Sequence, residues 1–280
     1  MVVRQHGRVG AAVVATLGLL VCGTSVTGCV GGGAAAEDDP SGTDAVQALH
    51  GAAAALVRAG SSRARTSMEM ATGGTRVTIR GEGVYDFRAR LGRLTVLLPR
   101  DPAGTEEHRP ITELLAPGAL FMKNRGAGVP ADKWVRVDTA TLSDGNLVTG
   151  GATDPYAAAQ LLHGARSASY VGRAEVAGTP VRHYRGVADI GLAARSAPAA
   201  DKEPFRAAAK GFATVEVPFD AYLDDQGRLR KVRHRFSFVN GRQKTTVAVA
   251  STTLLYGFGA PVDVRLPATR DIFAGKIAEP

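Results

Sequence analysis

The sequence predicts an α+β fold: one curved antiparallel β-sheet, a half-open barrel of about ten strands, whose concave face is covered by helices. Three observations support this. Apolar and polar residues alternate over most of the chain, as in half-buried strands. Few stretches have helical spacing. The apolar face of such a sheet needs a cover, and only these helices can supply it.

The first 28 residues have the three parts of a signal peptide. Arg4 and Arg8 give a positive start, and an apolar run extends from Val9 to Val21. This run is shorter than the roughly 20 residues that a spanning helix needs. We expect residues 1–28 to be removed, and the alternative is an uncleaved membrane anchor.

Val26-Thr27-Gly28-Cys29 is similar to the bacterial lipobox, in which an aliphatic residue and two small residues precede a cysteine. In such signals the thiol takes a diacylglyceryl group. Cleavage would remove Cys22 and leave Cys29 as the only thiol. We therefore predict Cys29 as a lipid anchor that holds the protein at the extracytoplasmic face of the cell membrane.

The remaining chain divides into a tether and one domain. Residues 29–42 are small and locally acidic, which indicates a flexible tether. Residues 43–280 suit a single all-β or α+β domain. The net charge is +8, to which the removable Arg4 and Arg8 contribute two. A basic balance favours contact with anionic surfaces such as phospholipid headgroups, and the alternative is a merely soluble basic surface.

The first expected element is a helix. Thr43 or Asp44 can cap it, and Gly60 can end it. Its apolar stripe at helical spacing consists of Val46, Leu49, Ala53, Leu56 and Val57.

Alternation begins at about Ser62 and predicts the strands of the first half of the sheet. These strands fall within 76–80, 93–96, 112–123 and 133–138. Pro117-Gly118 and Asn124-Arg125-Gly126 are turn signals, and 129–132 reads as a loop.

A second helix is predicted from Asp154-Pro155 to Gly164, because Thr153 or Asp154 can cap it and Pro155 suits the first turn. Strands follow at 170–176 and 181–190. Residues 191–211 are rich in Ala and broken by Pro198 and Pro204, which predicts two short helical pieces. Strands at 214–224, 228–239 and 243–255 complete the sheet, and Asn240-Gly241 signals a hairpin.

The sequence contains no recognisable catalytic, metal or cofactor motif. The histidines (His6, His50, His108, His163, His183 and His234) have no metal-binding spacing. Asp86, Glu113 and Asp138 could act as acid and base, but nothing in the sequence brings two of them together. We predict a protein that is not an enzyme, with no metal and no cofactor.

Two charged stretches have plainer explanations than a binding site. Asp224-Asp225-Gln226-Gly227 lacks the later ligands of a calcium loop and predicts a hairpin turn. Arg228, Arg230, Arg233 and Arg235 could touch phosphates, although alternation already explains them as a solvated convex face. Nucleic acid is not an expected partner outside the cell.

The apolar strand faces suggest a ligand pocket between the sheet and its helices. The alternative is a simple core, above all for Trp134, the only tryptophan. The candidate pocket residues are Leu56, Val77, Ile79, Leu94, Val96, Leu98, Phe121, Trp134, Phe236 and Phe238.

Several motifs, in order, resemble the LppX/LprG family of actinobacterial lipoproteins, which have a LolA/LolB-like fold. The stretches that carry the resemblance are 81–87, 119–123, 133–138, 154–155, 172–178, 183–186, 221–229 and 256–262. The resemblance covers roughly Val46 to Phe273. It implies a half-open barrel whose concave face, roofed by helices, binds lipid, and it brings no catalytic residues.

Together these observations predict an anchored lipoprotein that binds acyl chains of lipid or lipoglycan in a hydrophobic cavity and carries or chaperones them in the cell envelope. It would be a monomer, with an envelope transporter as a further partner. The alternative is a non-catalytic surface sensor or adaptor that contacts another envelope protein. An envelope hydrolase has the least support, because no nucleophile–base pair emerges.

Overall fold

The computed structural model describes residues 41–72, 75–99, 109–126, 128–240 and 245–275. The chain divides into two units, Met1–Asp38 and Asp39–Pro280, and the described residues all lie in the second. The predicted signal peptide, Cys29 and almost all of the predicted tether lie outside the described residues.

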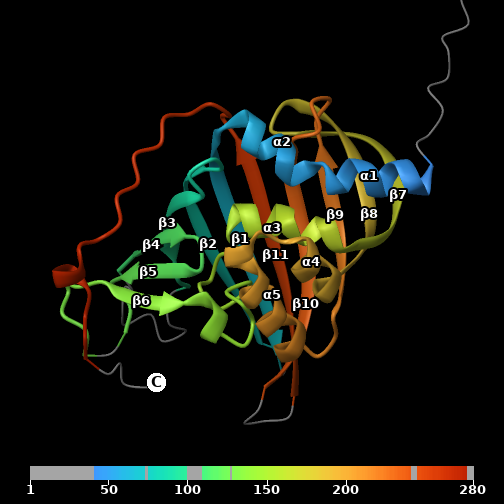
Figure 1. The fold of residues 1–280 in the computed structure, drawn as a ribbon. Coiled ribbons are helices and arrows are strands. Elements are labelled where there is room, and N and C mark those ends of the chain that lie inside the picture. The colour runs from blue at the N-terminus through green and yellow to red at the C-terminus, as the bar shows by residue number, and fades with distance from the viewer. Residues whose placement is uncertain (1–40, 73–74, 100–108, 127, 241–244, 276–280) are drawn as a thin grey trace, which may run out of the picture. The chain divides into compact units, whose positions relative to one another are not determined.

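The second unit is built on one antiparallel sheet of 11 strands, in the order β6-β5-β4-β3-β2-β1-β11-β10-β9-β8-β7 (Figure 1). The α+β fold class is confirmed, with one strand more than the ten or so expected. The strands are β1 Ser61–Thr72, β2 Thr75–Asp86, β3 Leu91–Leu97, β4 Ile111–Ala116, β5 Ala119–Lys123, β6 Val135–Asp138, β7 Ala165–Val176, β8 Thr179–Asp189, β9 Glu216–Leu223, β10 Leu229–Asn240 and β11 Thr245–Tyr256.

Alternation gives the sheet two different faces. In β3, Leu94 and Val96 are fully buried, whereas Arg93 and Thr95 are exposed. The register carries this division across the sheet, because residues paired between neighbouring strands share a face. We call the face that carries Leu94 the concave face and the opposite one the convex face.

Helices pack on the concave face (Figure 1). They are α1 Gly42–His50, α2 Ala52–Ala59, α3 Pro155–Leu161, α4 Ile190–Ser196 and α5 Ala199–Gly211, with short 3-10 turns η1 Thr139–Thr141, η2 Leu162–Gly164 and η3 Thr269–Asp271. Buried alanines make much of their inner surface, including Ala45, Ala52, Ala158, Ala193 and Ala208. Small side chains let the helices approach the sheet and one another closely.

The first predicted helix is two helices, and its cap differs from the prediction. Ser41 is the N-cap, and Asp44 bonds back to it to form a capping box, so neither Thr43 nor Asp44 is the cap. Gly51 separates α1 from α2, and Gly60 ends α2 as predicted, with φ +85°.

The later helices follow the prediction more closely. Asp154 caps α3 through the N–H groups of Tyr156 and Ala157, and Pro155 occupies the first turn. The segment 191–211 does form two helices, which break at Ala197-Pro198. Pro204 lies inside α5 without ending it, so the predicted break there is wrong; an internal proline costs one backbone hydrogen bond, and the buried contacts of Phe205 and Ala208 hold the helix.

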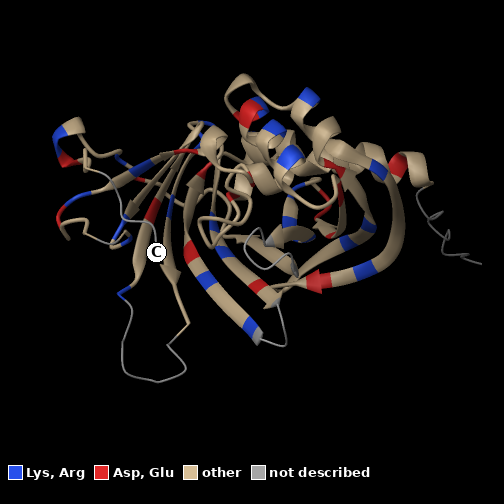
Figure 2. Cartoon of the chain, turned by 90° about the horizontal axis from the view of Figure 1, so that it is seen from below, with Lys and Arg blue, Asp and Glu red and all other residues tan. Residues whose placement is uncertain are grey.

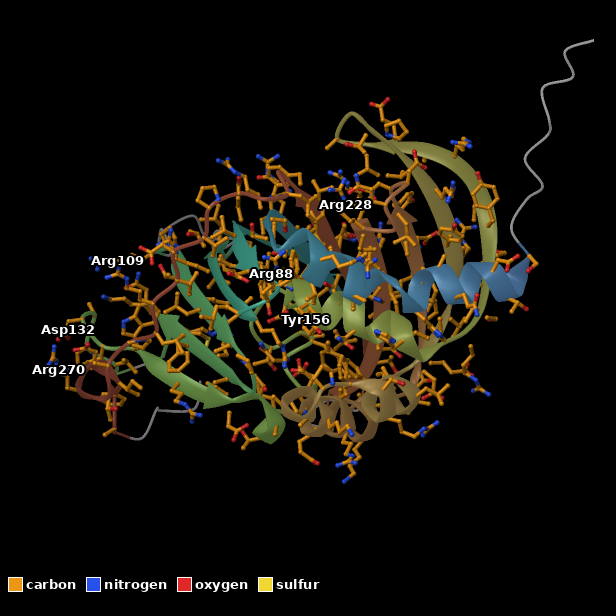
Figure 3. The ribbon with its side chains drawn as sticks, turned by 45° about the horizontal axis from the view of Figure 1, so that its top comes forward. Arg88, Arg109, Asp132, Tyr156, Arg228 and Arg270 are labelled. Carbon is orange, nitrogen blue, oxygen red and sulfur yellow. The ribbon has the colours of Figure 1, made fainter. Side chains whose placement is uncertain are left out.

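A turn of the sheet fastens the cover at one end. Arg88, in the turn between β2 and β3, donates from Nε to the carbonyl of Val57 at 3.3 Å and from a terminal nitrogen to that of Arg58 at 3.2 Å (Figure 3). These carbonyls belong to the last turn of α2, where a cation is favoured.

Candidate functional site

The concave face and its cover enclose most of the predicted pocket residues. Leu56 on α2 and Ile79, Leu94, Val96 and Phe236 on the sheet are buried within one hydrophobic cluster. Val77, Leu98 and Phe238 are partly buried at the margin of the same cluster. The structure thus brings these candidates together between sheet and helices.

Phe121 and Trp134 do not belong to this group. On β5, Leu120 and Met122 point to the concave side, so Phe121 between them points to the convex side. There Phe121 and Trp134 form a small second cluster with Leu114, Ala119, Val264 and Ile272. Strand alternation excludes them from the concave interior, where the prediction had placed them.

An irregular segment, residues 142–154, covers the concave side of β1 to β4. Leu147, Val148, Ala152 and Thr153 in it are buried. Gly151 adopts φ +82°, and a Cβ placed on it would lie 3.1 Å from Cγ2 of Ile79 and 3.5 Å from Cγ1 of Val96. This segment therefore lies directly over two of the predicted pocket residues.

Side-chain hydrogen bonds hold the 142–154 segment in place. The Asp144 carboxylate accepts from the N–H groups of Asn146, Val148 and Thr149 at 3.1, 2.8 and 2.6 Å. The Thr153 hydroxyl lies 2.8 Å from the Leu147 carbonyl and 2.5 Å from the hydroxyl of Ser251 on β11. Asp144 therefore shapes the segment, and Thr153 joins it to the sheet.

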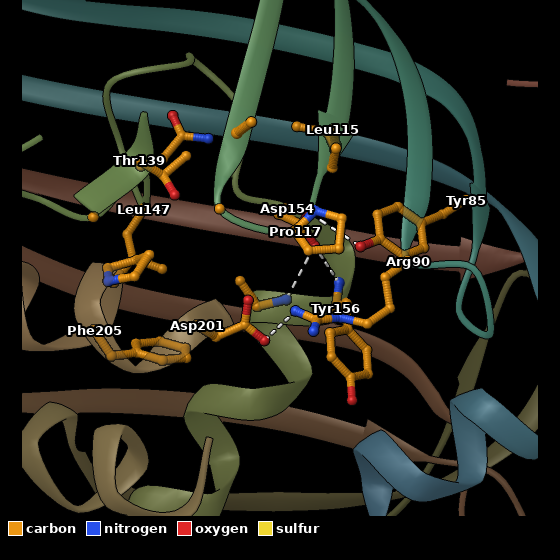
Figure 4. A pocket seen from close by; sticks show the side chains of 17 residues that line it. Tyr85, Arg90, Leu115, Pro117, Thr139, Leu147, Asp154, Tyr156, Asp201 and Phe205 are labelled. Carbon is orange, nitrogen blue, oxygen red and sulfur yellow. Dashed lines mark hydrogen bonds and ion pairs between the residues drawn. The ribbon is translucent and has the colours of Figure 1, made fainter. Parts of the chain in front are cut away.

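A cavity of about 40 Å³ lies where the cover meets the turns of β2–β3 and β4–β5 (Figure 4). Its polar lining comes from Tyr85, Arg90, Asp154, Tyr156 and Asp201. Sites for drug-sized ligands are typically about 300–1,000 Å³. The cavity has room for a few water molecules and is too small for an acyl chain in this conformation.

The cavity lining is partly polar and partly apolar, and burial strongly influences its ionisable groups. Tyr85 donates to Asp154 at 3.2 Å, and burial raises the pKa of Asp154 to about 6 against the lowering effect of its N–H donors. Arg90 pairs with Asp201, and its guanidinium lies 4.9 Å from the ring centre of Tyr156. Arg90 has φ +58°, a strained conformation for a non-glycine residue, and such strain clusters at functional sites.

Several buried polar atoms on the concave side have no hydrogen-bond partner among the described residues: those of Ser62, Thr66, Glu113, Gln160 and His234. Glu113 is fully buried on β4, and burial raises the pKa of its carboxyl to about 8. Burial lowers the pKa of His234 to about 3. An unpaired buried polar group typically costs about 1–3 kcal/mol, so the closed packing of cover on sheet is weaker than a fully apolar one.

The largest buried side chains at this site were not predicted from the sequence. Tyr85, Phe87 and Phe219 are almost completely buried, and the Tyr85 and Phe87 rings pack 5.1 Å apart. The alternation that identified Val77 and Ile79 continues along β2 to Tyr85. Gly81 and Gly83 interrupt its apolar positions, which hid the signal.

The predicted acid–base candidates serve separate local roles. Asp86 accepts from the N–H groups of Arg88 and Ala89 in a turn, and Asp138 caps η1. Glu113 is isolated in the interior. Among the described residues no group of three metal-binding side chains occurs. The structure therefore does not bring two of these three acids together.

The convex face is rich in arginine. Asp220 on β9, itself nearly buried, accepts from His183 at 2.9 Å, Arg185 at 2.9 Å and Arg235 at 2.8 Å. These hydrogen bonds outweigh its burial and lower the pKa of Asp220 to about 2. Figure 2 shows the Lys and Arg residues as bands along the strands.

Solved structures of similar fold include two mycobacterial lipoproteins. Lipoprotein LppX of Mycobacterium tuberculosis matches with 11% identity and a TM-score of 0.49, over 80% of this chain and 100% of that chain. LprF of Mycobacterium bovis matches with 15% identity and a TM-score of 0.40, over 82% and 99%. A Vibrio parahaemolyticus domain described as an outer membrane lipoprotein-sorting protein matches with 10% identity and a TM-score of 0.31, over 79% and 94%.

LppX and LprF are lipoproteins of the kind that the sequence motifs resemble. No protein-family model matches the chain, and no curated protein sequence matches it. Within the described residues no helix is both long and apolar enough to cross a membrane. At these identities and TM-scores no function follows from the likeness, so the function has to be argued from the residues.

Proposed function

We propose that the protein is a lipid-anchored envelope lipoprotein that binds acyl chains between the concave face of its sheet and the cover formed by α1 to α5 and the 142–154 segment. Binding proceeds by displacement of the cover, and the protein carries or chaperones the bound lipid. No reactive group is needed, because burial of apolar surface supplies the affinity.

The observation that carries this proposal is the chemical mismatch between the two layers. The sheet offers a broad apolar surface, with Leu94, Val96, Val249 and Phe236 all buried, although buried polar side chains interrupt it. The cover packs against this surface mainly with alanines and with one irregular segment. It leaves polar atoms such as the carboxyl oxygens of Glu113 without a hydrogen-bond partner. A guest chain would replace poor contacts of the cover with better ones of its own.

The small cavity fits this proposal as the entrance. It lies at the edge of the cover, and Arg90 and Asp201 give it a charged rim. A lipid headgroup would remain at this rim while the chain enters beneath the 142–154 segment. The described conformation is then the closed form.

The anchor at Cys29 is the second part of the proposal, and metabolic labelling with an alkyne fatty acid tests it. We expect the wild-type chain and the Cys22→Ala variant to take up the label and the Cys29→Ala variant to take up none. Labelling of the Cys29→Ala variant would contradict the assignment.

Native mass spectrometry tests lipid binding. Residues 41–280 contain every described helix and strand, and this fragment would be purified from the host without detergent. We expect a mass increase that extraction with organic solvent removes and that added fatty acid or phospholipid restores. A fragment that carries no lipid and takes up none on incubation would refute lipid binding.

A filled interior is also what a non-catalytic sensor or adaptor would have, and the 40 Å³ cavity favours that second candidate. Its partner would contact the sheet edge or the convex face. The mass spectrometry decides between the two, since an adaptor of this kind has no lipid to lose or regain.

A further inference from the structure

Basic side chains outnumber acidic ones on the convex face. The basic ones are Arg63, Arg65, Arg76, Arg80, Arg93, Lys123, Arg136, Arg185, Lys231, Arg233 and Arg235. The acidic ones are Glu69, Glu82, Asp86, Asp138, Asp189, Glu216 and Asp220. Residues that pair across neighbouring strands share a face, so these side chains form one surface.

Ion pairs hold some of these arginine side chains in place. Arg185 and Arg235 both bond to Asp220, yet their side chains remain 63% and 47% exposed. Glu82 and Glu69 each take one arginine, Arg65 and Arg233. Glu69, Glu82 and Asp220 are thus matched or outnumbered by guanidinium groups, which stay at the surface.

Other arginines of this face have no acid paired with them. Arg76, Arg80 and Arg93 are exposed and form no ion pair among the described residues, whereas Arg63 lies near the carboxylate of Glu82. The cover side differs, because α5 mixes the signs, with Asp201 and Glu203 beside Lys202, Arg206 and Lys210. The excess positive charge therefore belongs to the sheet (Figure 2).

A groove of about 270 Å³ lies on the same face, over β3 and β4. It is lined by Arg93, Thr112, Leu114, Trp134, Asp263, Val264 and Arg265. Trp134 and Leu114 give it an apolar wall, Arg93 supplies positive charge, and Arg265 pairs with Asp263 at 3.3 Å. Tryptophan is typical of membrane–water interfaces, where one end of its ring system is apolar and the other is hydrated.

We propose that the convex face is a docking surface for the anionic phospholipid headgroups of the membrane, with Trp134 at the headgroup level. Charge complementarity selects this partner, since each basic residue near an anionic surface strengthens binding about fivefold. A tether raises the effective concentration of the two surfaces. The docking surface rests on the anchored location in the proposed function and not on the acyl cavity.

The single tryptophan makes the docking measurable in the full lipidated chain. The protein would be reconstituted into liposomes that contain brominated phosphatidylcholine, with or without 30% phosphatidylglycerol, and the emission of Trp134 recorded. The test variant is Arg80→Glu/Arg93→Glu on the convex face. The matched control is Arg206→Glu/Lys210→Glu on α5, which changes the net charge equally.

We expect quenching of Trp134 in anionic liposomes, little in neutral ones, and loss of the quenching in 0.5 M NaCl. The convex variant should lose it and the α5 control should keep it. In the unanchored fragment 41–280, the convex variant should bind anionic vesicles at least tenfold more weakly than the control.

Equal emission in neutral and anionic liposomes, or equal loss in both variants, would overturn the docking surface. Quenching by a brominated chain inside the acyl site would not depend on surface charge or salt. Failure of docking and failure of acyl binding are therefore distinguishable.

Discussion

At the scale of single residues, the site is defined by polar groups in an apolar interior. Glu113 is the clearest of them, since it lies fully buried between Ile111 and Leu115 on the concave side of β4 with both oxygens unpartnered. A buried carboxyl of this kind is neutral in the folded protein and becomes charged when its surroundings open. The stability of the closed state therefore depends on pH through Glu113.

Glu113 should make stability fall as pH rises. The pKa of its carboxyl is about 8 in the folded protein, above its ordinary value, because burial disfavours the charged form. Between these two pKa values the folded protein holds a proton that the unfolded chain has lost, so the free energy of unfolding falls as pH rises towards 8. Between pH 6.5 and pH 8 we expect a loss of roughly 1.5–2 kcal/mol in the free energy of unfolding. Urea titrations at both pH values should show the slope in wild type and in Glu203→Gln, and not in Glu113→Gln.

The pH window isolates Glu113 from the other buried groups. The pKa of Asp154 is about 6, so the fall in the free energy of unfolding that it causes is mostly complete below pH 6.5. Asp220, with a pKa of about 2, acts at lower pH and with the opposite sign. His234, with a pKa of about 3 against its ordinary 6.5, also has the opposite sign, and the small rise in stability that it adds near pH 6.5 is the same in wild type and in both variants. An unchanged slope in Glu113→Gln would show that this carboxyl does not titrate as described.

At the scale of elements, the glycines of β2 set how closely the strands approach. A Cβ on Gly83 would lie 1.8 Å from the carbonyl oxygen of Arg93 in β3. Gly51, in contrast, has a helical conformation with φ −74°, and its Cβ would meet nothing closer than 3.4 Å. The two positions should respond to alanine in opposite ways.

Gly83→Ala should destabilise the protein by about 2–4 kcal/mol, because the strand pair β2–β3 must separate to admit the methyl group. Gly51→Ala should stabilise it by about 0.5–1 kcal/mol, since alanine suits a helix better than glycine does. Thermal unfolding of both variants measures this. A neutral Gly83→Ala would contradict the close approach of the strands.

Asp144 should control the mobility of the 142–154 segment. Asp144→Ala removes the acceptor for three backbone N–H groups, which we expect to cost about 2 kcal/mol and to speed hydrogen exchange over residues 145–151. Lipid uptake should also become faster. Asp138→Ala, which removes the cap of η1, should leave exchange in 145–151 unchanged, and equal exchange in both variants would refute the role of Asp144.

The elements show what the sequence could predict. Alternation identified the strands and the inward side of Ile79, Leu94 and Val96, and cap residues located α3 and the end of α2. The cap at Ser41 and the split at Gly51 were missed, because neighbouring polar residues are equally able to cap and glycine is tolerated within a helix. Trp134 was misplaced because the sequence does not show that the C-terminal segment, with Val264 and Ile272, packs on the convex side of the sheet edge.

The 142–154 segment could not be predicted at all, since it has neither helical nor strand periodicity. Its position depends on long-range contacts, such as that between Thr153 and Ser251. The cavity is equally hidden, because Arg90 and Asp201 are far apart in the chain and meet only in the folded protein.

At the scale of the whole molecule, the closed interior and the proposed function are compatible only if the cover moves. The hydroxyl oxygens of Thr153 and Ser251 are 2.5 Å apart, so Thr153→Cys and Ser251→Cys together place two thiols within reach of a disulfide. Neither native cysteine lies within residues 41–280, so this pair would be the only thiols of the fragment.

Uptake of a fluorescent fatty acid by this double variant, oxidised and then reduced, tests the movement of the cover most directly. We expect the oxidised form to take up at least tenfold less than the reduced form, and each single variant to be insensitive to reductant. Equal uptake with the disulfide closed and open would show that the lipid does not enter beneath the 142–154 segment.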